Sequence, residues 1–303
     1  YKTNNYKNKI MSLNSIKNFG LIGASGYVAP RHMNAIKETN NQLKCFLDPH
    51  DNVGYIDKYF PNAKYFKETE RFERHLDRLK RKNQQVDYVS VCSPNYLHDS
   101  HIRLALRNNC DVICEKPLVI NYDHLLSLKS IEEETGKKIY TILQLRHHPT
   151  IVKLKKTLDV NKKYDVNLTY ITPRGSWYDF SWKGDNDKSG GILFNIGIHF
   201  FDMLIWLFGK PIKSDVTNQD RKSFGTINLE RANINFKLSI DKNDLPWNEW
   251  KPFRLIEIDG EELEFSDGFT DLHTVSYQNI LNGLGFGVND VEESIKLVNI
   301  LKK

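Results

Sequence analysis

The sequence predicts an α/β protein with a doubly wound parallel sheet, followed by an α+β domain that carries an open, mainly antiparallel sheet. Strand-like and helix-like patterns alternate up to about residue 145, as they do when helices cross over a parallel sheet. Beyond about residue 148, strand-like runs follow one another, which is typical of antiparallel pairing. The 303 residues are enough for two domains, expected at 15–145 and 146–303, with residues 1–14 as a flexible extension.

The first domain is expected to be a series of strand and helix units. An apolar strand over 16–22 runs into a glycine-containing turn and a helix over 30–39, and a second strand follows over 43–48. Periodicity and capping signals continue the alternation. The later helices are expected at 69–81, 95–107 and 121–135, and the later strands at 86–92, 111–114 and 139–144.

The second domain begins with a predicted helix over 150–158 and continues mostly as strands. Asp259-Gly260 is a hairpin signal between strands over 255–258 and 261–265. Helices over 272–281 and 290–301 are expected to pack against the preceding part of the chain. The other strands are predicted at 164–172, 211–217, 224–229, 232–240 and 253–258.

The turn after the first strand has the spacing of a dinucleotide-binding turn. Small residues at Gly23, Gly26 and Ala29 allow a pyrophosphate to approach the backbone, and the following helix offers unpaired N–H groups. Asp48 ends the second strand at the position of a ribose-binding carboxylate, which favours NAD over NADP. Taken alone, the glycines also fit a tight structural turn, and Asp48 fits a turn aspartate before Pro49.

Ligands of doubly wound sheets bind outside the carboxyl ends of the strands, so the residues at the predicted strand ends are expected to bind the cofactor. Asn95 and His98 also fit simpler roles as loop and helix-cap residues. The expected cofactor-binding residues are Gly23, Ser25, Gly26, Tyr27, Val28, Asp48, Ser93, Pro94, Asn95, His98, Glu115, Lys116 and Gln144.

Two short segments carry the residues for proton transfer. CEKPL places Lys116 just after a predicted strand, and GGILFNIGIHFFD places Asn195, His199 and Asp202 at helical steps of four and three. We expect these three residues on one helical face. His199 alone also fits a core histidine, but a lysine and a cofactor turn in the same chain favour catalysis.

Composition limits the other function classes. The net charge of +5 is spread over 43 basic and 38 acidic residues, so nothing predicts a nucleic-acid partner. No run of about 18 apolar residues predicts a membrane span. The four cysteines do not form paired zinc motifs and are expected to be reduced and buried in a cytoplasmic protein; Arg146-His147-His148 does not predict a metal site either.

The order of these motifs resembles the superfamily of glucose-fructose oxidoreductase, inositol dehydrogenase and rhizopine-catabolism proteins (Gfo/Idh/MocA). The matching pattern is strand-GxxGxxA-helix, then EKP, then GG-x5-G-x-H-x2-D, and it covers the chain from about Ile16. Segments such as GLIGASGYVAPRHMNAIK, DVICEKPL and FNIGIHFFDML are similar to UDP-N-acetyl-2-amino-2-deoxyglucuronate dehydrogenases of bacterial surface-polysaccharide (O-antigen, lipopolysaccharide) synthesis. The resemblance implies a Rossmann-type first domain.

The resemblance also implies an activity, the NAD-dependent oxidation of the C3 hydroxyl of UDP-N-acetylglucosaminuronate (UDP-GlcNAcA) to a 3-keto sugar. His199 would be the base and Lys116 would hydrogen-bond the same oxygen, sharing the proton if positive neighbours lower its pKa. A 2-oxo acid such as 2-oxoglutarate would regenerate NAD, and the protein would be a homo-oligomer, a tetramer assembled through the open sheet. The alternatives are a dehydrogenase of another sugar or cyclitol and a non-enzymatic NAD-binding regulator.

One residue departs from the family pattern, because many members carry an aspartate where this chain has Asn195. An amide cannot act as a base, but it can position a sugar hydroxyl or Lys116. The segment 174–185, rich in cations and aromatic residues, suits a diphosphate, a uronate and a ring. The expected substrate-binding residues are Arg146, Arg174, Tyr178, Trp182, Lys183 and Asn195.

Overall fold

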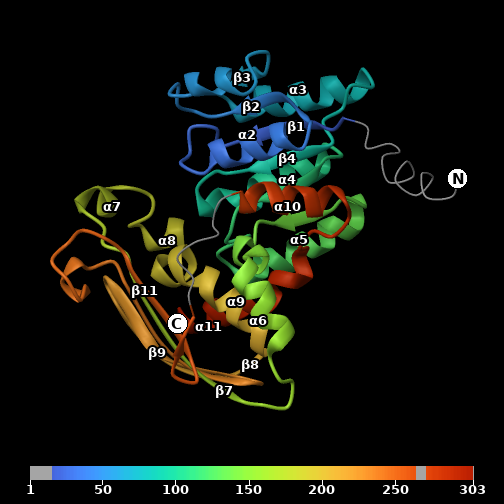
Figure 1. The fold of residues 1–303 in the computed structure, drawn as a ribbon. Helices are drawn as coiled ribbons and strands as arrows, with labels where there is room; N and C mark the ends of the chain where they lie inside the picture. The colour runs from blue at the N-terminus through green and yellow to red at the C-terminus, as the bar shows by residue number, and fades with distance from the viewer. Residues whose placement is uncertain (1–15, 264–270, 303) are drawn as a thin grey trace, which may run out of the picture.

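The computed structural model describes residues 16–263 and 271–302, and within them the strands form two sheets (Figure 1). The predicted extension 1–14 and the end of the predicted strand 261–265 lie outside the described residues. The first sheet is parallel, with the order β3-β2-β1-β4-β5-β6. Its strands are β1 (Asn18–Ile22), β2 (Gln42–Leu47), β3 (Lys64–Phe66), β4 (Tyr88–Val91), β5 (Asp111–Cys114) and β6 (Ile139–Thr141).

The strand order reverses between β1 and β4, and this is where a doubly wound sheet binds its ligand. The helices of this layer confirm the predicted alternation. They are α2 (Ala29–Glu38), α3 (Thr69–Arg81), α4 (His98–Arg107) and α5 (Tyr122–Thr135), with short 3₁₀ turns η1 (Gly54–Lys58) and η2 (Asn95–Leu97). The edge strand β3 was not predicted, because three residues are too few to show a period.

The second sheet has the order β12-β11-β7-β10-β9-β8. Its pairs are antiparallel except for β7 with β10, which confirms the mainly antiparallel expectation. Between and around these strands lie the 3₁₀ turns η3 (Gln144–His147) and η5 (Lys242–Asp244) and the helices α6 (Pro149–Thr157), α7 (Ser176–Phe180) and α8 (Asn186–Ser189). The strands are β7 (Tyr164–Ile171), β8 (Pro211–Gln219), β9 (Lys222–Leu229), β10 (Ala232–Ser239), β11 (Phe253–Ile258) and β12 (Glu261–Glu262).

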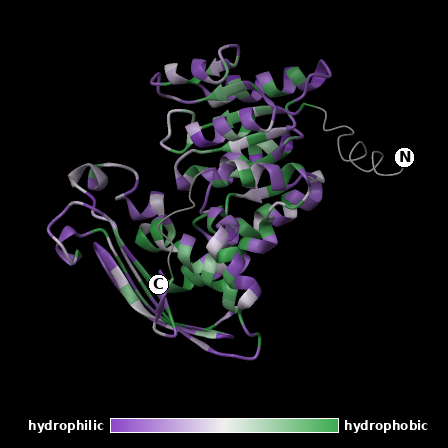
Figure 2. Ribbon diagram, viewed as in Figure 1, coloured by the Kyte–Doolittle hydropathy of each residue, from purple (hydrophilic) through white to green (hydrophobic). Residues whose placement is uncertain are grey.

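The helix α9 (Ile198–Phe208) packs on one face of the second sheet. Phe201 meets Phe236 of β10 with their ring centroids 5.1 Å apart. The helical segment 186–208 is long and apolar enough to cross a membrane by composition, contrary to the sequence expectation. Because 72% of its apolar window is buried, core packing explains its composition, and Figure 2 shows hydrophobic residues gathered around α9.

The last helices return to both layers. The helix α10 (Leu272–Leu281) packs against α2 (Figure 1), and its Tyr277 belongs to the same hydrophobic cluster as Phe19 and Met33 under the first sheet. The turn η6 (Val288–Val291) leads to α11 (Glu292–Leu301), which packs against α9. The core under the first sheet therefore contains residues from the end of the chain. The cysteines are buried and unpaired, as predicted.

Candidate functional site

The turn between β1 and α2 is shaped by close backbone contact. Gly23 has φ of +85°, and a Cβ there would lie 2.5 Å from the backbone nitrogen of Ser93. The helix that follows begins with no side-chain cap and no acidic residue in its first turn, so no carboxylate offsets its positive dipole end. These features fit the pyrophosphate of a dinucleotide. The expectation of unpaired N–H groups in its first turn is wrong, because Ala29 and Arg31 donate to the Gly26 and Val28 carbonyl oxygens and Pro30 has no N–H.

Replacing Gly23 with alanine is expected to weaken both folding and NAD binding. Gly136 is a matched control, because its φ is +65° but a Cβ there meets nothing within 4 Å. Gly136→Ala should cost about 1 kcal/mol of unfolding free energy from the left-handed backbone alone. Gly23→Ala should cost about 2 kcal/mol more from the clash, with NAD affinity at least about tenfold lower. Thermal unfolding and calorimetric NAD titration measure both effects; equal effects of the two variants would contradict this reading of the turn.

Asp48 is buried and tied to the turn by Ser25. Its Oδ2 accepts hydrogen bonds from the Ser25 backbone N–H and hydroxyl, each at 2.8 Å, and its Oδ1 accepts from the His50 N–H at 2.9 Å. A carboxylate has about four acceptor positions, so about one remains for a ribose hydroxyl. The geometry fits the predicted ribose contact and adds the link to Ser25, which the sequence did not predict.

A cleft of about 670 Å³ runs along the carboxyl ends of β1, β2 and β4. It contains Trp182 and Lys183, which the sequence assigned to the substrate. It also contains Lys67 and His101, which were not predicted. The predicted cofactor residues that line it are Gly23, Ser25, Gly26, Tyr27, Val28, Asp48, Ser93, Pro94, Asn95, His98, Glu115 and Lys116.

Two of these residues are engaged by the protein itself. The His98 ring is fully buried, with Nδ1 2.7 Å from the Pro117 carbonyl oxygen and Nε2 2.8 Å from that of Ser93. Asn95 Nδ2 donates to the Ser189 carbonyl oxygen at 2.8 Å. We therefore replace the predicted cofactor contact of His98 by a positioning role, in which it ties the loops after β4 and β5 together.

A smaller cavity of about 320 Å³ brings the predicted catalytic residues together. Lys116 and His199 line it with Asn195, Arg174 and Gln144, and Lys116 and Asn195 also line the cofactor cleft. Arg31, Tyr170, Phe200 and Arg254 lie in the same cavity and were not predicted. No local pattern marks such side chains, because packing between remote segments turns them inward.

Lys116 is held beside the cavity by a backbone contact. Its Nζ donates to the Asn195 carbonyl oxygen at 3.0 Å. Burial lowers the pKa of Lys116 to about 8; Glu115 opposes this decrease, and the positive charges of Lys183 and Arg174 add to it. A sizeable fraction of this amine is therefore neutral near pH 8.

The contact between Lys116 and Asn195 depends on a widened helical turn. Leu193–Gly197 form a π-helix, η4, immediately before α9. A π turn changes the backbone hydrogen-bond pattern, and here the carbonyl of Asn195 receives the lysine. The Asn195 side chain instead donates to the Tyr178 hydroxyl at 3.0 Å, so Asn195 positions Lys116 through its backbone.

His199 lines the cavity as a neutral ring. Burial lowers its pKa well below the usual value, and the nearby charge of Lys116 lowers it further. A neutral imidazole can accept or donate a hydrogen bond to a substrate hydroxyl. Its protonation beside Lys116 is unfavourable, however, so it is a weak final acceptor for a proton.

The predicted single face of Asn195, His199 and Asp202 is wrong for Asp202. Its carboxylate forms a bidentate pair with Arg146, with both N–O distances at 2.8 Å, and accepts from the Ser294 hydroxyl at 3.2 Å. The predicted substrate contact of Arg146 is also wrong, because its guanidinium is buried in this pair and donates to the Asp290 carbonyl oxygen. The π turn shifts Asn195 relative to the residues of α9, and Asp202 faces Ser294 of α11.

The segment after β7 contributes in two ways. Tyr178 is buried and supports Asn195, whereas Lys183 lies near the rings of Trp177 and Trp182, 5.6 and 5.7 Å from their centroids. The segment 174–185 was expected to be a loop, but it contains the short helix α7, and α8 follows directly after it. Among the described residues, the side chains of His32, Glu115 and His273 lie close enough to one another to hold a metal ion. This group does not include any residue of the Arg146-His147-His148 run.

Comparisons with known proteins agree with the fold. A family model described as an oxidoreductase family with an NAD-binding Rossmann fold matches residues 17–143, and its C-terminal alpha/beta domain matches residues 161–237. The chain is 27% identical over 240 residues to the glucose-6-phosphate 3-dehydrogenase of Bacillus subtilis, covering 76% of this chain and 61% of that relative's length.

Solved structures give a longer match. The WlbA (WbpB) dehydrogenase from Thermus thermophilus, in complex with NAD and UDP-GlcNAcA, has 44% identity and a TM-score of 0.91 over 95% of both chains. A structure of the same enzyme with NAD and alpha-ketoglutarate has 45% identity and a TM-score of 0.92 over the same shares.

Proposed function

The chain belongs to the Gfo/Idh/MocA oxidoreductase family, with an NAD-binding Rossmann domain, and from this premise we propose that it oxidises C3 of UDP-GlcNAcA. The observation that carries the substrate assignment is the charge of the catalytic cavity. Arg31, Arg174 and Arg254 line it together with Lys116. Guanidinium groups bind carboxylates and phosphates bidentately, so this cavity suits an anionic sugar better than a neutral sugar or a cyclitol.

The retained lysine and histidine support an enzyme rather than a regulator that only binds NAD. NAD, when bound in the cleft, accepts the hydride that leaves C3. The neutral amine of Lys116 takes the hydroxyl proton as the C3–O double bond forms, and His199 orients the hydroxyl. This exchanges the roles that the family resemblance implied, in which His199 is the base and Lys116 hydrogen-bonds the oxygen. We prefer Lys116 as the base because a group that titrates near the working pH accepts the proton more effectively.

The same cavity can serve a second substrate. We assign to it a 2-oxo acid such as 2-oxoglutarate, whose carboxylates suit the arginines; a structure of the Thermus thermophilus neighbour is in complex with NAD and alpha-ketoglutarate. The hydride returns to the keto carbon, and the Lys116 ammonium supplies the proton to the new hydroxyl. The 2-oxo acid then leaves as a 2-hydroxy acid, and the oxidised cofactor is ready for the next sugar.

The experiment that tests the function combines the purified protein with NAD⁺ and UDP-GlcNAcA, with and without 2-oxoglutarate. We expect a product that has lost two hydrogen atoms, detected by mass spectrometry, together with 2-hydroxyglutarate. UDP-N-acetylglucosamine, which lacks the uronate, and glucose 6-phosphate are the comparison substrates. With bound cofactor confirmed, the absence of product from UDP-GlcNAcA rejects the proposal, and faster turnover of glucose 6-phosphate moves it to a sugar phosphate.

The rate of sugar oxidation is expected to rise with pH through an apparent pKa of about 8, the value for Lys116. Below that pKa the amine is protonated and cannot accept the proton, so the rate should fall about tenfold per pH unit. If His199 were the base, it would already be neutral at pH 7 and the rate would be level between pH 7 and 9. Single-turnover absorbance measurements from pH 6 to 10 distinguish the two.

The wider setting follows from the resemblance. We propose that the 3-keto sugar is made in the cytoplasm for an aminotransferase step of surface-polysaccharide (O-antigen) synthesis, by a homotetramer assembled through the open face of the second sheet. The exposed Ile212 and Phe224 on β8 and β9 support such a contact. Light scattering of the purified protein measures the oligomeric state.

A further inference from the structure

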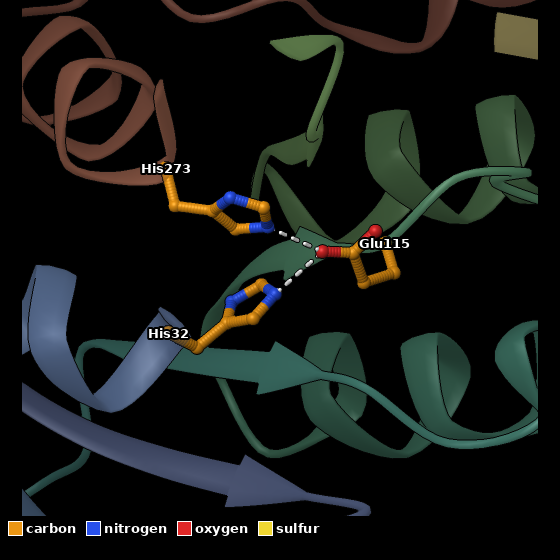
Figure 3. A group of neighbouring side chains, drawn as sticks. All are labelled: His32, Glu115 and His273. Carbon is orange, nitrogen blue, oxygen red and sulfur yellow. Dashed lines mark hydrogen bonds and ion pairs between the residues drawn. The ribbon is translucent and has the colours of Figure 1, made fainter. Parts of the chain in front are cut away.

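His32, Glu115 and His273 form a buried cluster beside the catalytic lysine (Figure 3). A single carboxylate oxygen, Glu115 Oε1, lies 2.8 Å from the Nε2 of His32 and 2.8 Å from the Nε2 of His273. His32 lies on α2 and His273 on α10, while Glu115 directly follows β5. The cluster therefore joins elements from both ends of the chain at the residue that precedes Lys116.

The protonation states follow from the hydrogen bonds. Hydrogen bonds from His273 and His32 outweigh the burial that would raise the Glu115 pKa and hold it well below its usual value. An ionised carboxylate only accepts, so both Nε2 atoms must donate to it. Burial lowers the His32 pKa, so the ring is neutral and its Nδ1 accepts from the Tyr277 hydroxyl at 2.7 Å. Ser90 Oγ, 2.6 Å from that hydroxyl, then donates to Tyr277.

The cluster has residue types that can bind a metal, but its geometry is that of a hydrogen-bonded network. The donor nitrogens lie at hydrogen-bond distance from the same oxygen. Ligands of tetrahedral zinc, at about 2.0–2.1 Å from the ion, stand about 3.3 Å from one another. A satisfied network of this kind rigidifies the segments that it joins. It also places one buried negative charge next to Lys116.

The negative charge of Glu115 affects the pKa values of both Lys116 and His199. It raises the pKa of Lys116 against burial, Lys183 and Arg174. It also raises the pKa of His199 against burial, Lys116, His273 and Arg254. These groups come from the end of β5, the segment after β7, the helices α9 and α10, and the strand β11.

We propose that Glu115, clamped by His32 and His273, is a positioning residue that fixes the backbone from which Lys116 projects and places a negative charge near its amine. The proposal rests on the function proposed for Lys116. Glu115 lines the cofactor cleft but not the cavity that contains Lys116 and His199. His273 extends this control to α10, so the closing helix of the chain takes part in the catalytic site.

Glu115→Gln is the main test, because glutamine keeps the shape and removes the charge. We expect the apparent pKa of sugar oxidation to fall by about one unit. At pH 9–10, where the amine is neutral in both proteins, turnover should fall about tenfold or more, because Lys116 is then less firmly placed and less basic, while KM and NAD affinity change less than about threefold. Glu134→Gln on the exposed face of α5 is the matched control and should change none of these. A tenfold loss of NAD affinity without a change in the pH profile would show Glu115 to be a cofactor ligand and overturn the proposal.

A second readout does not depend on the substrate. In protein labelled with ¹³C at lysine Cε, the signal absent from Lys116→Arg reports the titration of Lys116, and Glu115→Gln should move it to lower pH by about one unit. If this shift is present while UDP-GlcNAcA is not oxidised, the proposed function fails and the positioning role stands. An unshifted signal overturns the positioning role.

The histidine and metal arms complete the test. His273→Phe, which removes a donor, should lower turnover more than His273→Gln, which keeps one; equal losses with unchanged thermal stability would contradict the clamp. The two His273 variants also keep the proposal testable if Glu115→Gln does not fold. Elemental analysis after incubation with Zn²⁺ should find no stoichiometric metal. If the wild type binds one equivalent of Zn²⁺ and Glu115→Gln binds none, the cluster is a metal site and the proposal is overturned.

Discussion

Lys116→Met is expected to lower the turnover of sugar oxidation by about 10³–10⁴-fold, the largest effect among the single substitutions proposed for activity. Methionine fills a similar volume but can neither take the hydroxyl proton nor stabilise negative charge on the C3 oxygen. The Lys116 amine is already placed by Asn195, so its removal loses an ordered group rather than a mobile one. Single-turnover kinetics with saturating substrate measure the loss directly.

Controls separate chemistry from binding and folding. Lys116→Arg keeps a positive charge that cannot be removed near neutral pH, so it should retain cofactor binding but lose the rise in rate through pH 8. Lys163→Met, at an exposed lysine before β7, should behave as the wild type. His199→Gln should cost less than Lys116→Met. The opposite ranking would return the role of base to His199.

Asp202→Ala is expected to lower the free energy of unfolding by about 3–5 kcal/mol, because it leaves the Arg146 guanidinium buried without its carboxylate partner. Both side chains are 4% exposed. The Ser294 hydroxyl also donates a hydrogen bond to the Asp202 carboxylate. Arg146 keeps its hydrogen bond to the Asp290 carbonyl oxygen, a longer ion pair to Asp290 with N–O of 3.7 Å, and its position over the rings of Trp206 and Phe286, and these contacts replace the lost carboxylate only in part. The midpoints of thermal and urea unfolding report the change.

Removing both charges is the informative comparison. The double variant Arg146→Met with Asp202→Leu leaves no unpaired ion and should be more stable than Asp202→Ala. Asp51→Asn is the surface control, because its ion pair with Lys67 is solvent-exposed, and its unfolding midpoint should not change measurably. If the double variant is as unstable as the single one, packing rather than an unpaired charge explains the loss.

Much of the fold could be predicted because its signals are local. Thr69–Arg81 and Asp111–Cys114 begin and end where the pattern placed them. The predicted strand over 139–144 ends at Thr141, where the chain turns into η3. A short apolar run predicts extended structure without showing where pairing stops, because pairing depends on the neighbouring strand.

Within the candidate site, residues in glycine turns and at strand ends were easier to predict than residues that pack in from elsewhere. The Gly23 turn and the Lys116 position follow from the βα pattern, and Lys116, Asn195 and His199 do line one cavity. Arg31 and Arg254 line that cavity as well, but one is on a helix and the other on a strand, and nothing local distinguishes them from surface arginines.

The sequence by itself determined the layered architecture, the family, the dinucleotide turn and the two residues proposed for proton transfer, because these depend on short-range periodicity, backbone freedom and side-chain chemistry. Only the tertiary structure settled which polar groups meet. Asp202 pairs with Arg146, and Glu115 joins His32 to His273 across segments far apart in the chain. Burial and neighbouring charge set the pKa of Lys116, and both exist only once those segments have packed together.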